Sequence, residues 1–537
     1  MNICSAICRS LGAQDLAAFE RFRAAFSPED RRHFTFLNQR PFEELLDPKR
    51  FWVVRCLVQG EEIVGYAHLE KFSQPEKAHV GRLGIIVSSH VRGQGAAKEL
   101  MKDLLNTARD LGIAKVWLSV HRDNVRATRL YESVGFRCEG FFEDEERDAN
   151  GSRDIIAMSC FLDRPSREEN VPHIPWSRPV IQTEEIVEVI KVLQSGWITQ
   201  GQITEMFEKK LASYLEVKHV VAFNNGTSAL FAAYKTAFQP GDTVLFPTYT
   251  FVSTLNAAML CGIQAILVDS EVHTGNIDLD QAEEILKNVP GVRGLVVVDI
   301  AGLPCDILRC YRLSQSYGLT LIEDAAQAIG ATIWNHRKIG SFGHLTTFSF
   351  HAAKLLTAGE GGAIATDDDR VDLLLRKIRN HGESFQQKFV WDTFGLNLRP
   401  TDVQAGIALA QLAKLEQFIS RRNKIAAFYR EKLQGLVEFQ IIPDYVGRHP
   451  YMLFLAKLKS ALRLEIQGRL EREGINTRLS WMPLHQQPVF KGMFSGSWPV
   501  AEDWGARGLC LPIYSNMPLH EAERVGETLQ KAINTLG

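Results

Sequence analysis

The sequence lacks the patterns that identify membrane-spanning, nucleic-acid-binding and metal-binding proteins. No segment approaches the roughly 18 uncharged apolar residues of a transmembrane helix. The 61 Lys and Arg residues nearly balance the 63 Asp and Glu residues, so the net charge is −2 and no basic domain stands out. The nine cysteines are scattered, and even Cys305 and Cys310 have no second Cys or His pair near them. We therefore expect no membrane insertion, no nucleic-acid binding and no metal site.

A secretory signal and a disulfide framework are also missing. The first residues, MNICSAICRSLGAQDLAAFERF, reach Asp15 and Glu20 before any apolar run attains signal-peptide length. The density of cysteine is too low for a secreted disulfide scaffold. These two absences predict a cytoplasmic protein.

The length indicates more than one domain. A chain of 537 residues exceeds what one hydrophobic core usually organises, while 45% hydrophobic and 23% charged residues are average for globular proteins. The stretch DRPSREENVPHIPWSRP, residues 163–179, holds four prolines and six charged residues and interrupts all hydrophobic periodicity. We predict a first domain at 1–163, a linker at 164–171 and a second domain at 172–537.

The second domain alternates short apolar runs with amphipathic stretches. The expected strands are 218–223, 243–246, 265–268, 294–298 and 319–322, and the expected helices are 226–238, 251–261, 280–288 and 307–317. This rhythm predicts an α/β fold with a mostly parallel sheet covered by helices on both faces. In such sheets, ligands bind at the carboxyl ends of the strands.

Two segments at such strand ends suit a phosphate and a flat ring. In FNNGTSAL, Gly226, Thr227 and Ser228 begin a helix directly after a strand, where backbone N–H groups and the helix dipole favour a phosphate. The alternative is an ordinary Asn-Gly turn with Thr227 as N-cap. In FPTYTFVST, Tyr249 and Phe251 lie at the next turn, and a ring there can either stack on a planar ligand or pack into the core.

Two further segments supply an acid and a base. In LTLIEDAAQAIGA, Asp324 follows the strand and can pair with a pyridinium nitrogen, and Gln327 can reach the same ligand if the turn continues helically. In FSFHAAKLLTAGEGGAI, Lys354 interrupts an apolar run. Such a lysine either extends to the surface or is functional, and desolvation would lower its pKa and expose a neutral amine for Schiff-base formation.

The order and spacing of these segments resemble the DegT/StrS family of pyridoxal-phosphate (PLP) sugar aminotransferases. The resemblance runs from about Pro172 to the C-terminus. IPWSRPVIQTEEIVEVIKVLQSGWITQG is similar to the opening segment of the family, and GLNLRPTDVQAGIALAQLAKLE resembles its dimer-interface helix. The resemblance implies an aspartate aminotransferase-like fold with a smaller C-terminal α+β subdomain.

The resemblance also implies roles for individual residues. Lys354 would bind the cofactor as a Schiff base and shuttle the proton. Asp324 would contact the pyridinium nitrogen, Gln327 would lie near the ring hydroxyl, and Phe251 would stack on the ring. The phosphate would lie among Gly226, Thr227 and Ser349. Asn397 would reach the phosphate from a neighbouring subunit, so a homodimer is expected. Leu398 and Pro400 depart from the family pattern, which leaves the sugar preference open.

The implied reaction is an amino transfer. L-Glutamate would leave its nitrogen on the cofactor, and a nucleotide-linked keto sugar would accept it. Relatives that dehydrate instead have histidine at the lysine position, so Lys354 favours transamination. The stretch TAGEGG, with Glu360, resembles members that aminate C4 of a 4-keto-6-deoxy sugar; C3 amination is the alternative, and Glu360 could also merely cap or solvate its loop.

The first domain contains two blocks in a second recognisable order. LGIIVSSHVRGQGAAKELMKDLLNTARDLG indicates a strand, a Gly-rich turn and a helix, although a plain tight turn would look the same. KVWLSVHRDNVRATRLYESVGFRCEG follows with N-x-x-A-x-x-L-Y-x-x-x-G-F spacing. Together they resemble the GNAT acyltransferases, which have a mixed sheet with flanking helices and use acetyl-CoA.

By this second resemblance, the pyrophosphate of acetyl-CoA would lie against Arg92, Gly93, Gly95 and Ala97. Asn124 would contact the pantetheine arm, and Tyr131 would protonate the departing thiolate, unless it is an ordinary core tyrosine. His68, Glu70 and His79 remain open candidates for the general base.

The two resemblances are chemically complementary, because an aminotransferase makes a primary amine and an N-acetyltransferase consumes one. The sequence predicts a bifunctional enzyme that makes and then N-acetylates a nucleotide-linked amino sugar for cell-surface polysaccharide or glycan biosynthesis. Two alternatives are an acetyltransferase acting on an unrelated amine and a regulator that uses the PLP module as a sensor. The regulator would need a basic winged helix-turn-helix domain, which the sequence does not show.

Overall fold

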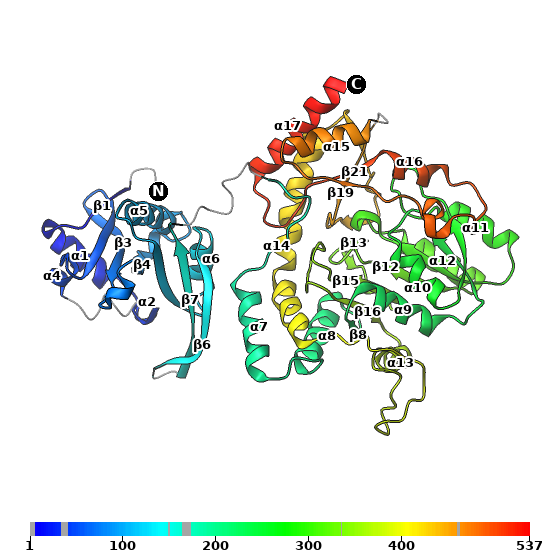
Figure 1. Cartoon of the computed structure of the whole chain (residues 1–537), viewed down its shortest axis with the longest axis horizontal. Helices are drawn as coiled ribbons and strands as arrows, with labels where there is room; N and C mark the ends of the chain where they lie inside the picture. The colour runs from blue at the N-terminus through cyan, green and yellow to red at the C-terminus, as the bar shows by residue number, and fades with distance from the viewer. Residues whose placement is uncertain are drawn as a thin grey trace. The chain divides into compact units, whose positions relative to one another are not determined.

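The computed structural model describes residues 6–33, 41–148, 151–163, 173–334, 336–458 and 462–536. The chain divides into two compact units, residues 1–170 with 182–187 and residues 171–181 with 188–537 (Figure 1). Helix α7, Thr183–Ser195, therefore contains the last boundary between them. The predicted linker, 164–171, lies outside the described residues, so the predicted domain limits remain a proposal.

The first unit is built on one seven-stranded mixed sheet. Its strands, in spatial order, are β1 (Ile7–Ser10), β2 (Phe51–Gln59), β3 (Glu62–Lys71), β4 (Val80–Val87), β5 (Lys115–His121), β7 (Gly151–Phe161) and β6 (Arg137–Asp148). All neighbours pair antiparallel except β4 and β5. That parallel pair is hydrogen-bonded only from Val80–Lys115 to Arg82–Trp117, so the two strands part toward their carboxyl ends.

Helices flank this sheet, as predicted. They are α1 (Leu16–Ala24), α2 (Pro28–His33), α4 (Phe42–Leu45), α5 (Ala96–Asp110) and α6 (Val125–Glu132). Helix α5 is amphipathic and packs its apolar side, which includes Leu100 and Leu104, against β2 and β3. The ring of Phe19 in α1 meets the ring of Tyr66 in β3 edge to face at 5.3 Å. The parted end of β4 leads through residues 88–95, which include the glycine loop, into α5, and that of β5 leads through a short turn into α6, which positions the candidate acetyl-CoA residues.

The second unit is built on a mostly parallel seven-stranded sheet. Its strands, in spatial order, are β10 (Gln264–Val268), β9 (Thr243–Pro247), β11 (Val292–Val298), β12 (Thr320–Asp324), β15 (Leu345–Ser349), β16 (Gly362–Thr366) and β8 (His219–Phe223). Only β16 runs antiparallel to its neighbours. The predicted strands are confirmed, with bounds that shift by one or two residues.

Both faces of this sheet are buried, because successive residues of each strand enter different cores. In β11, Leu295 and Val297 belong to one hydrophobic cluster, and Val296 and Val298 belong to the other. The helices of this region are α8 (Gln202–Leu215), α9 (Gly226–Ala237), α10 (Ser253–Leu260), α11 (Leu279–Asn288), α12 (Ile307–Tyr317), α13 (Asp369–Arg379) and α14 (Asp402–Lys432). Figure 1 shows α14 running along much of the second unit. Continuous apolar strands between two helical layers explain the parallel arrangement.

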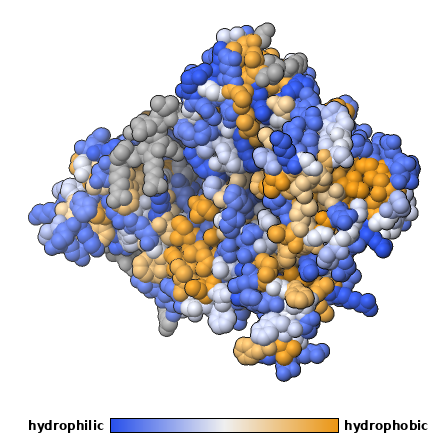
Figure 2. Space-filling model, turned by 45° about the vertical axis from the view of Figure 1, so that its right-hand side comes forward, coloured by the Kyte–Doolittle hydropathy of each residue, from blue (hydrophilic) through white to orange (hydrophobic). Residues whose placement is uncertain are grey.

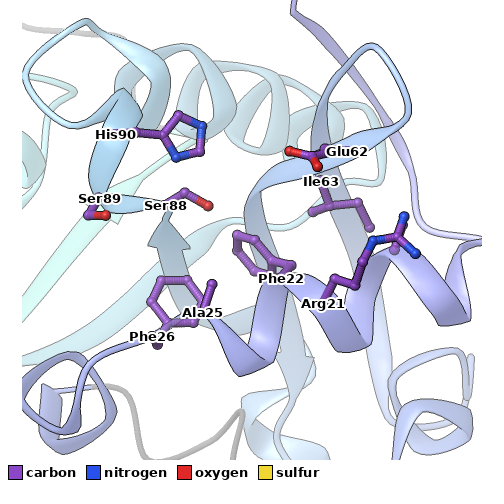
Figure 3. Close-up of a pocket in the computed structure, with 10 residues that line it drawn as sticks. Arg21, Phe22, Ala25, Phe26, Glu62, Ile63, Ser88, Ser89 and His90 are labelled. Atoms are coloured by element: carbon purple, nitrogen blue, oxygen red, sulfur yellow. The ribbon is translucent and has the colours of Figure 1, made fainter.

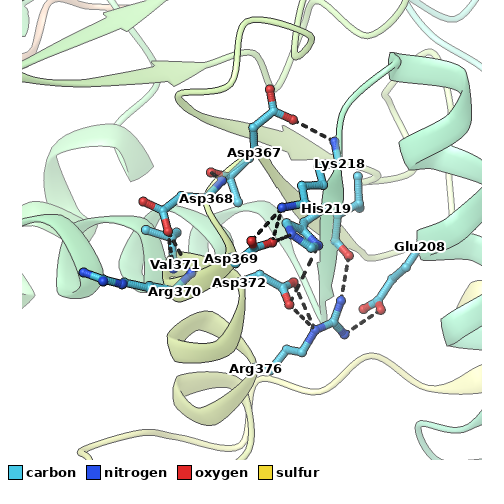
Figure 4. A network of polar contacts seen from close by, with 12 residues as sticks. Glu208, Lys218, His219, Asp367, Asp368, Asp369, Arg370, Val371, Asp372 and Arg376 are labelled. Atoms are coloured by element: carbon cyan, nitrogen blue, oxygen red, sulfur yellow. Dashed lines mark hydrogen bonds and ion pairs between the residues drawn. The ribbon is translucent and has the colours of Figure 1, made fainter.

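Partly buried ion pairs fix the edge strand β8. Arg376 of α13 donates from Nη1 to Glu208 of α8 at 2.8 Å and from Nε to Asp372 at 3.0 Å, as Figure 4 shows. Glu208 in turn accepts the backbone N–H of Ala222 in β8 at 2.9 Å. These bonds hold the end of β8, from which α9 begins.

A smaller α+β subdomain completes the second unit, as predicted. It contains the sheet β17 (Val437–Phe439), β19 (Phe454–Leu458), β21 (Gly508–Leu511) and β20 (Arg478–Leu479) with helices α15 (Arg463–Arg472), α16 (Pro499–Arg507) and α17 (Leu519–Leu536). A short sheet, β14 (Arg337–Lys338), β13 (Thr332–Ile333) and β18 (Val446–Arg448), lies elsewhere in the unit. Within the described ranges, no helix is both long and apolar enough to cross a membrane.

Candidate active sites

The N-terminus of α9 forms a tight cradle at the end of β8. Asn225 caps the helix, because its Oδ1 accepts the backbone N–H of Ser228 at 2.8 Å; Thr227 is therefore not the cap. Gly226 lies so close to Ser349 that a Cβ atom on Gly226 would stand 2.8 Å from the Ser349 Cβ and 3.0 Å from its Oγ. The structure thus brings Gly226, Thr227 and Ser349 together. A helix N-terminus beside a hydroxyl suits a phosphate.

Asp324 lies at the carboxyl end of β12, in the middle of the sheet. Its Oδ2 accepts a hydrogen bond from the Thr254 hydroxyl at 2.7 Å, and its Oδ1 accepts the backbone N–H of Ala326 at 3.2 Å. Burial raises the pKa of this carboxyl, and the hydrogen bond from Thr254 opposes the rise. A buried carboxylate held by neutral donors gains stability from a cation, such as a protonated ring nitrogen.

Gln327 is held in a turn, not in a helix, three residues beyond Asp324. Its Oε1 accepts the backbone N–H of Ala301 at 3.0 Å, which leaves its amide nitrogen oriented away from that contact. Ala301 has a positive φ of 61°, and a Cβ on the following Gly302 would lie 2.6 Å from the Gln327 carbonyl oxygen. The close approach therefore requires glycine at 302. Because Oε1 already accepts from Ala301, the amide nitrogen of Gln327 is the group left to donate to a ligand.

Lys354 follows β15 and is partly buried, so it is not a surface lysine. Burial lowers the pKa of its ammonium group to about 8, the Asp324 carboxylate opposes this shift, and the positive charge of Arg478 adds to it. A sizeable fraction of neutral amine is then present near neutral pH. Lys354 has the chemistry of a nucleophile and proton carrier.

The two aromatic residues after β9 have different environments. Tyr249 is fully buried, its hydroxyl bonds to Ser480, and its ring lies edge to face with Trp481 at 5.7 Å. Phe251 is 49% exposed, which is unusual for a phenylalanine. Tyr249 is a core residue, whereas the Phe251 ring is open to a planar ligand.

These residues fit PLP at the carboxyl ends of the strands. The close Gly226–Ser349 contact is a cradle that any side chain at 226 would fill, and buried Asp324 needs a positive partner. Lys354 would hold the cofactor aldehyde, Asp324 its ring nitrogen, and the α9 N-terminus with Ser349 its phosphate. Gln327 and Phe251 would bind the ring hydroxyl and one ring face.

Asn397 lies on an exposed segment that borders this cradle. The carbonyl oxygen of the next residue, Leu398, accepts the backbone N–H of Asn224 at 2.9 Å. Leu398 and Pro400, which depart from the family pattern, are both buried. Their apolar side chains therefore pack into the protein.

Glu360 is exposed, and its carboxylate lies 3.8 Å from the Nε2 atom of His351. Its backbone carbonyl accepts a hydrogen bond from the Gln404 side chain at 2.9 Å. The carboxylate is thus available to solvent or to a ligand beyond Lys354.

In the first unit, the N-terminus of α5 is open and uncapped. Gly95 precedes the helix with φ 92°, Gly93 has φ 78°, and a Cβ atom at either glycine would meet nothing within 4 Å. No side chain caps this helix end. Arg92 donates to the Val87 carbonyl and forms a 2.6 Å ion pair with Asp30. Free backbone N–H groups of the loop and of the first helical turn, which includes Ala97, suit a pyrophosphate.

Asn124 and Tyr131 lie near the two ends of α6, the helix that follows β5. Asn124 caps the helix through its Oδ1, which accepts the backbone N–H of Ala127 at 3.2 Å. Burial raises the pKa of Tyr131 to about 12, so its phenol stays protonated at neutral pH. A protonated phenol can donate to a departing thiolate.

None of the three proposed bases stands out. His68 is buried against Gly84, and burial lowers its pKa to about 3, which makes it a weak base. The Glu70 carboxylate pairs with Arg50 Nε at 3.0 Å. His79 is exposed and precedes β4, at the end away from the glycine loop.

His121 was not singled out from the sequence. It ends β5 and is largely buried, and its Nε2 lies 2.8 Å from Oε2 of Glu146 on β6. In the sequence, only its position shortly before Asn124 suggests that it lies near the candidate acetyl-CoA site. Its pairing with Glu146 depends on the β5, β7 and β6 order, which the sequence does not reveal.

A cavity of about 170 Å³ lies in the first unit just before the glycine loop. Figure 3 shows Phe22 of α1 and Ala25, which follows that helix, on one side and Ser88 and His90, which follow β4, on the other. Its volume is below the several hundred Å³ of typical substrate sites, so we assign no substrate to it.

Comparison with known proteins agrees with both sets of residues. The model of the DegT/DnrJ/EryC1/StrS aminotransferase family matches residues 179–530. The chain belongs to this family. The model of the acetyltransferase (GNAT) family matches residues 16–136, so the aminotransferase is preceded by a GNAT domain.

The matched region is similar to complete aminotransferase chains. GDP-perosamine synthase of Caulobacter vibrioides is 31% identical over 371 residues, which cover 68% of this chain and 99% of the relative. The spore coat polysaccharide biosynthesis protein SpsC of Bacillus subtilis is 33% identical over 385 residues, covering 67% and 97%. The structure of S. venezuelae DesV matches with a TM-score of 0.63 and 30% identity over 66% of this chain and 95% of its own. Aminotransferases of this family use PLP, and GNAT domains use acetyl-CoA.

Proposed function

We propose that the second unit transfers an amino group from L-glutamate to a nucleotide-linked 4-keto-6-deoxy sugar, and that the first unit then N-acetylates the product with acetyl-CoA. The observation that carries the proposal is the desolvated Lys354 amine beside buried Asp324, in a chain that also has a GNAT domain. One domain makes a primary amine and the other consumes one. Covalent linkage raises the local concentration of the intermediate.

In the amino-transfer half, the residues of this chain bind, hold and move protons. PLP, when bound, supplies an electron sink. The neutral Lys354 Nζ would accept the proton from the substrate carbon and donate it to the carbon on the other side of the transferred nitrogen, the former aldehyde carbon of the cofactor. The buried Asp324 carboxylate would favour a protonated ring nitrogen, and the α9 N-terminus would anchor the phosphate throughout.

The nature of the sugar is supported by one relative and one side chain. The relative GDP-perosamine synthase is named for a GDP-linked sugar product. Glu360, beyond Lys354, presents an exposed carboxylate where a sugar hydroxyl can donate to it. We therefore favour amination at C4 over C3, for cell-surface polysaccharide or glycan biosynthesis in the cytoplasm.

In the acetyl-transfer half, the open N-terminus of α5 would receive the pyrophosphate through backbone N–H groups. The pantetheine arm would enter between the parted ends of β4 and β5, where Asn124 lies. The phenol of Tyr131 would donate its proton to the thiolate as the acetyl group leaves for the amine.

We also propose that the active form is a homodimer through the aminotransferase unit. The loop after α13 exposes large apolar side chains, with Phe389 77%, Trp391 58% and Phe394 85% exposed. Figure 2 shows orange side chains adjoining blue ones at the lower end of the second unit, where this loop lies. Asn397, which follows the loop, would then serve the phosphate site of a neighbouring copy. Exposed apolar side chains in a cluster favour such an interface.

The test is to incubate the pure protein with glutamate, acetyl-CoA and a panel of GDP-, UDP- and dTDP-linked 4-keto-6-deoxy sugars. Mass spectrometry should find an N-acetylated amino sugar from one nucleotide series, and NMR should place the nitrogen at C4. Accumulation of the free amine alone would refute the coupled acetylation. The absence of any aminated sugar, with glutamate consumption intact, would refute the sugar assignment.

A further inference from the structure

One cation beside Lys354, Arg478, has so far entered only through its effect on the pKa of that lysine. Arg478 begins β20 in the C-terminal subdomain, and no role was assigned to it from the sequence. The preceding segment pairs with the opening segment of the unit: the N–H of Ile174 donates to the Gly474 carbonyl, and the N–H of Asn476 donates to the Ile174 carbonyl, both at 2.8 Å. This pairing brings Trp176 beside Arg478.

Two indole rings hold the Arg478 guanidinium. Its Cζ lies 5.2 Å from the centre of the Trp176 ring and 5.7 Å from that of Trp481. Contacts of this kind stabilise a cation without neutralising it. In the part of the chain that the structure describes, no carboxylate forms an ion pair with this guanidinium. Arg478 is therefore a positioned positive charge without a negative partner from those residues.

The same contacts place this charge next to the reactive lysine. The hydroxyl of Ser177, which follows Trp176, donates to the carbonyl of Ala353 at 3.4 Å, and Ala353 directly precedes Lys354. The positive charge of Arg478 contributes to the lowered pKa of Lys354. Trp481 adds a buried indole N–H that has no partner within the described residues. Such a donor costs free energy until a ligand or water accepts from it.

Three anionic groups enter the proposed reaction, which the following inference takes as its basis. The cofactor phosphate already has the cradle of Gly226 and Ser349. The diphosphate of a nucleotide sugar lies across the sugar ring from the reacting C4 atom. The α-carboxylate of an amino acid, in contrast, is bonded directly to the carbon that reacts at Lys354.

We propose that Arg478 binds the α-carboxylate of the amino donor, with the indoles of Trp176 and Trp481 holding its guanidinium in place. A planar guanidinium supported on its faces can present two parallel N–H donors to the two oxygens of a carboxylate. The keto sugar has no carboxylate bonded to its reacting carbon. Arg478 therefore serves the half-reaction that takes nitrogen from glutamate and leaves the half-reaction with the sugar largely unaffected.

The experiment compares the holoenzyme with Arg478→Gln and Arg478→Lys in the two half-reactions separately. Absorbance follows the PLP form with glutamate, and the pyridoxamine phosphate form with the keto sugar. We expect the half-saturating glutamate concentration to rise about 100-fold in Arg478→Gln and about 10-fold in Arg478→Lys, because the charge or the two-point geometry is lost. The half-saturating concentration of the keto sugar should stay within about threefold of the wild-type value in both variants.

A binding measurement separates recognition from turnover. Glutarate has two carboxylates and no amino group, so its dissociation constant can be measured by calorimetry. It should rise in the two Arg478 variants in the same order as the glutamate value. Arg469→Gln is the matched control and should change none of these values, because Arg469 lies on α15 and pairs with Glu465 of the same helix.

The possible results of these measurements distinguish the proposed role of Arg478 from other roles. Weakened binding of the sugar with unchanged binding of glutamate would assign Arg478 to the diphosphate and overturn the inference, as would no change in either substrate. If Arg478→Gln does not fold, Arg478→Lys with the glutarate titration still decides. If the wild-type enzyme reacts with glutamate but aminates no sugar, the proposed function fails while the Arg478 comparison remains valid.

Discussion

The chain contains two helix N-termini that suit phosphate groups, and they are built in opposite ways. The α9 terminus is capped by Asn225 and packed so tightly on Ser349 that no Cβ fits at Gly226. The α5 terminus has no side-chain cap, and nothing lies within 4 Å of a Cβ at Gly93 or Gly95. One site is closed and packed, and the other is an open loop.

This difference corresponds to how long each expected ligand, PLP in the closed site and acetyl-CoA in the open one, stays bound. A cofactor that stays bound through many turnovers benefits from a preformed, tightly packed site, because little ordering is needed on binding. A cosubstrate that must leave after each turnover is better served by open backbone groups. The charged residues also differ, since the closed site has Lys354 and Asp324, whereas Arg92 near the open site is paired with Asp30.

The largest effect should come from removing the lysine of the closed site. Lys354→Ala removes the nucleophile and proton carrier, so amination should fall by roughly 10⁴-fold. Acetylation of a supplied nucleotide-linked amino sugar should continue at the wild-type rate. Product mass spectrometry measures both. A parallel loss of acetylation would show that the two sites do not act independently.

The matching change in the first unit, which contains the open site, is Tyr131→Phe. It removes only the phenolic proton donor, and we expect acetyl transfer to fall about 100-fold while the KM for acetyl-CoA stays near its wild-type value. Amination should be unaffected. Thiol release measured with and without the amino sugar checks this result. An unchanged rate would mean that Tyr131 is a core residue, in line with its burial.

The two glycines provide the most direct test of the comparison. In Gly226→Ala, the new Cβ would stand 2.8 Å from the Ser349 Cβ, so something must shift, at a cost of about 1–3 kcal/mol. PLP affinity should fall between about 10-fold and 100-fold. Titration of the apoprotein with PLP measures it.

In Gly95→Ala, no atom blocks the new Cβ, and only the backbone at φ 92° is strained, by about 1–2 kcal/mol. The KM for acetyl-CoA should rise about 10-fold, with PLP affinity unchanged. If Gly226→Ala bound PLP normally, the closed site would be less rigid than its contacts indicate.

The smallest effect is the pH dependence of the closed site. Lys354 is protonated below its pKa of about 8 and neutral above it, so the rate at which the apoprotein captures PLP should rise about tenfold from pH 7 to 9. Because the Asp324 carboxylate raises this pKa, Asp324→Asn should move the midpoint to lower pH. A midpoint near 10.5 in the wild type would contradict the desolvation of Lys354.

Much of the fold could be predicted because its signals are local. The strands and helices of the second unit follow from apolar runs of limited length between turn residues, and short buried strands alternating with helices leave few arrangements. The cradle at Gly226 was recognisable from its position after a strand. The identity of its cap, Asn225 instead of Thr227, depended on a backbone geometry that the sequence does not specify.

The residues that were missed lie where distant segments meet. Arg478 becomes notable only because segment 474–476 pairs with Ile174 and thereby brings Trp176 beside it. His121 acquires its Glu146 partner through the order of three strands. Neither pairing produces a periodic pattern or a short motif in the amino-acid sequence.

The sequence by itself determined the two families, the order of the domains and the residue types that the chemistry needs, because these depend on motifs within short stretches. Only the tertiary structure decided which of those residues are desolvated, packed or open. Burial lowers the pKa of Lys354 and separates exposed Phe251 from buried Tyr249. Burial is a property of everything packed around a side chain, and most of those neighbours are far away in the sequence.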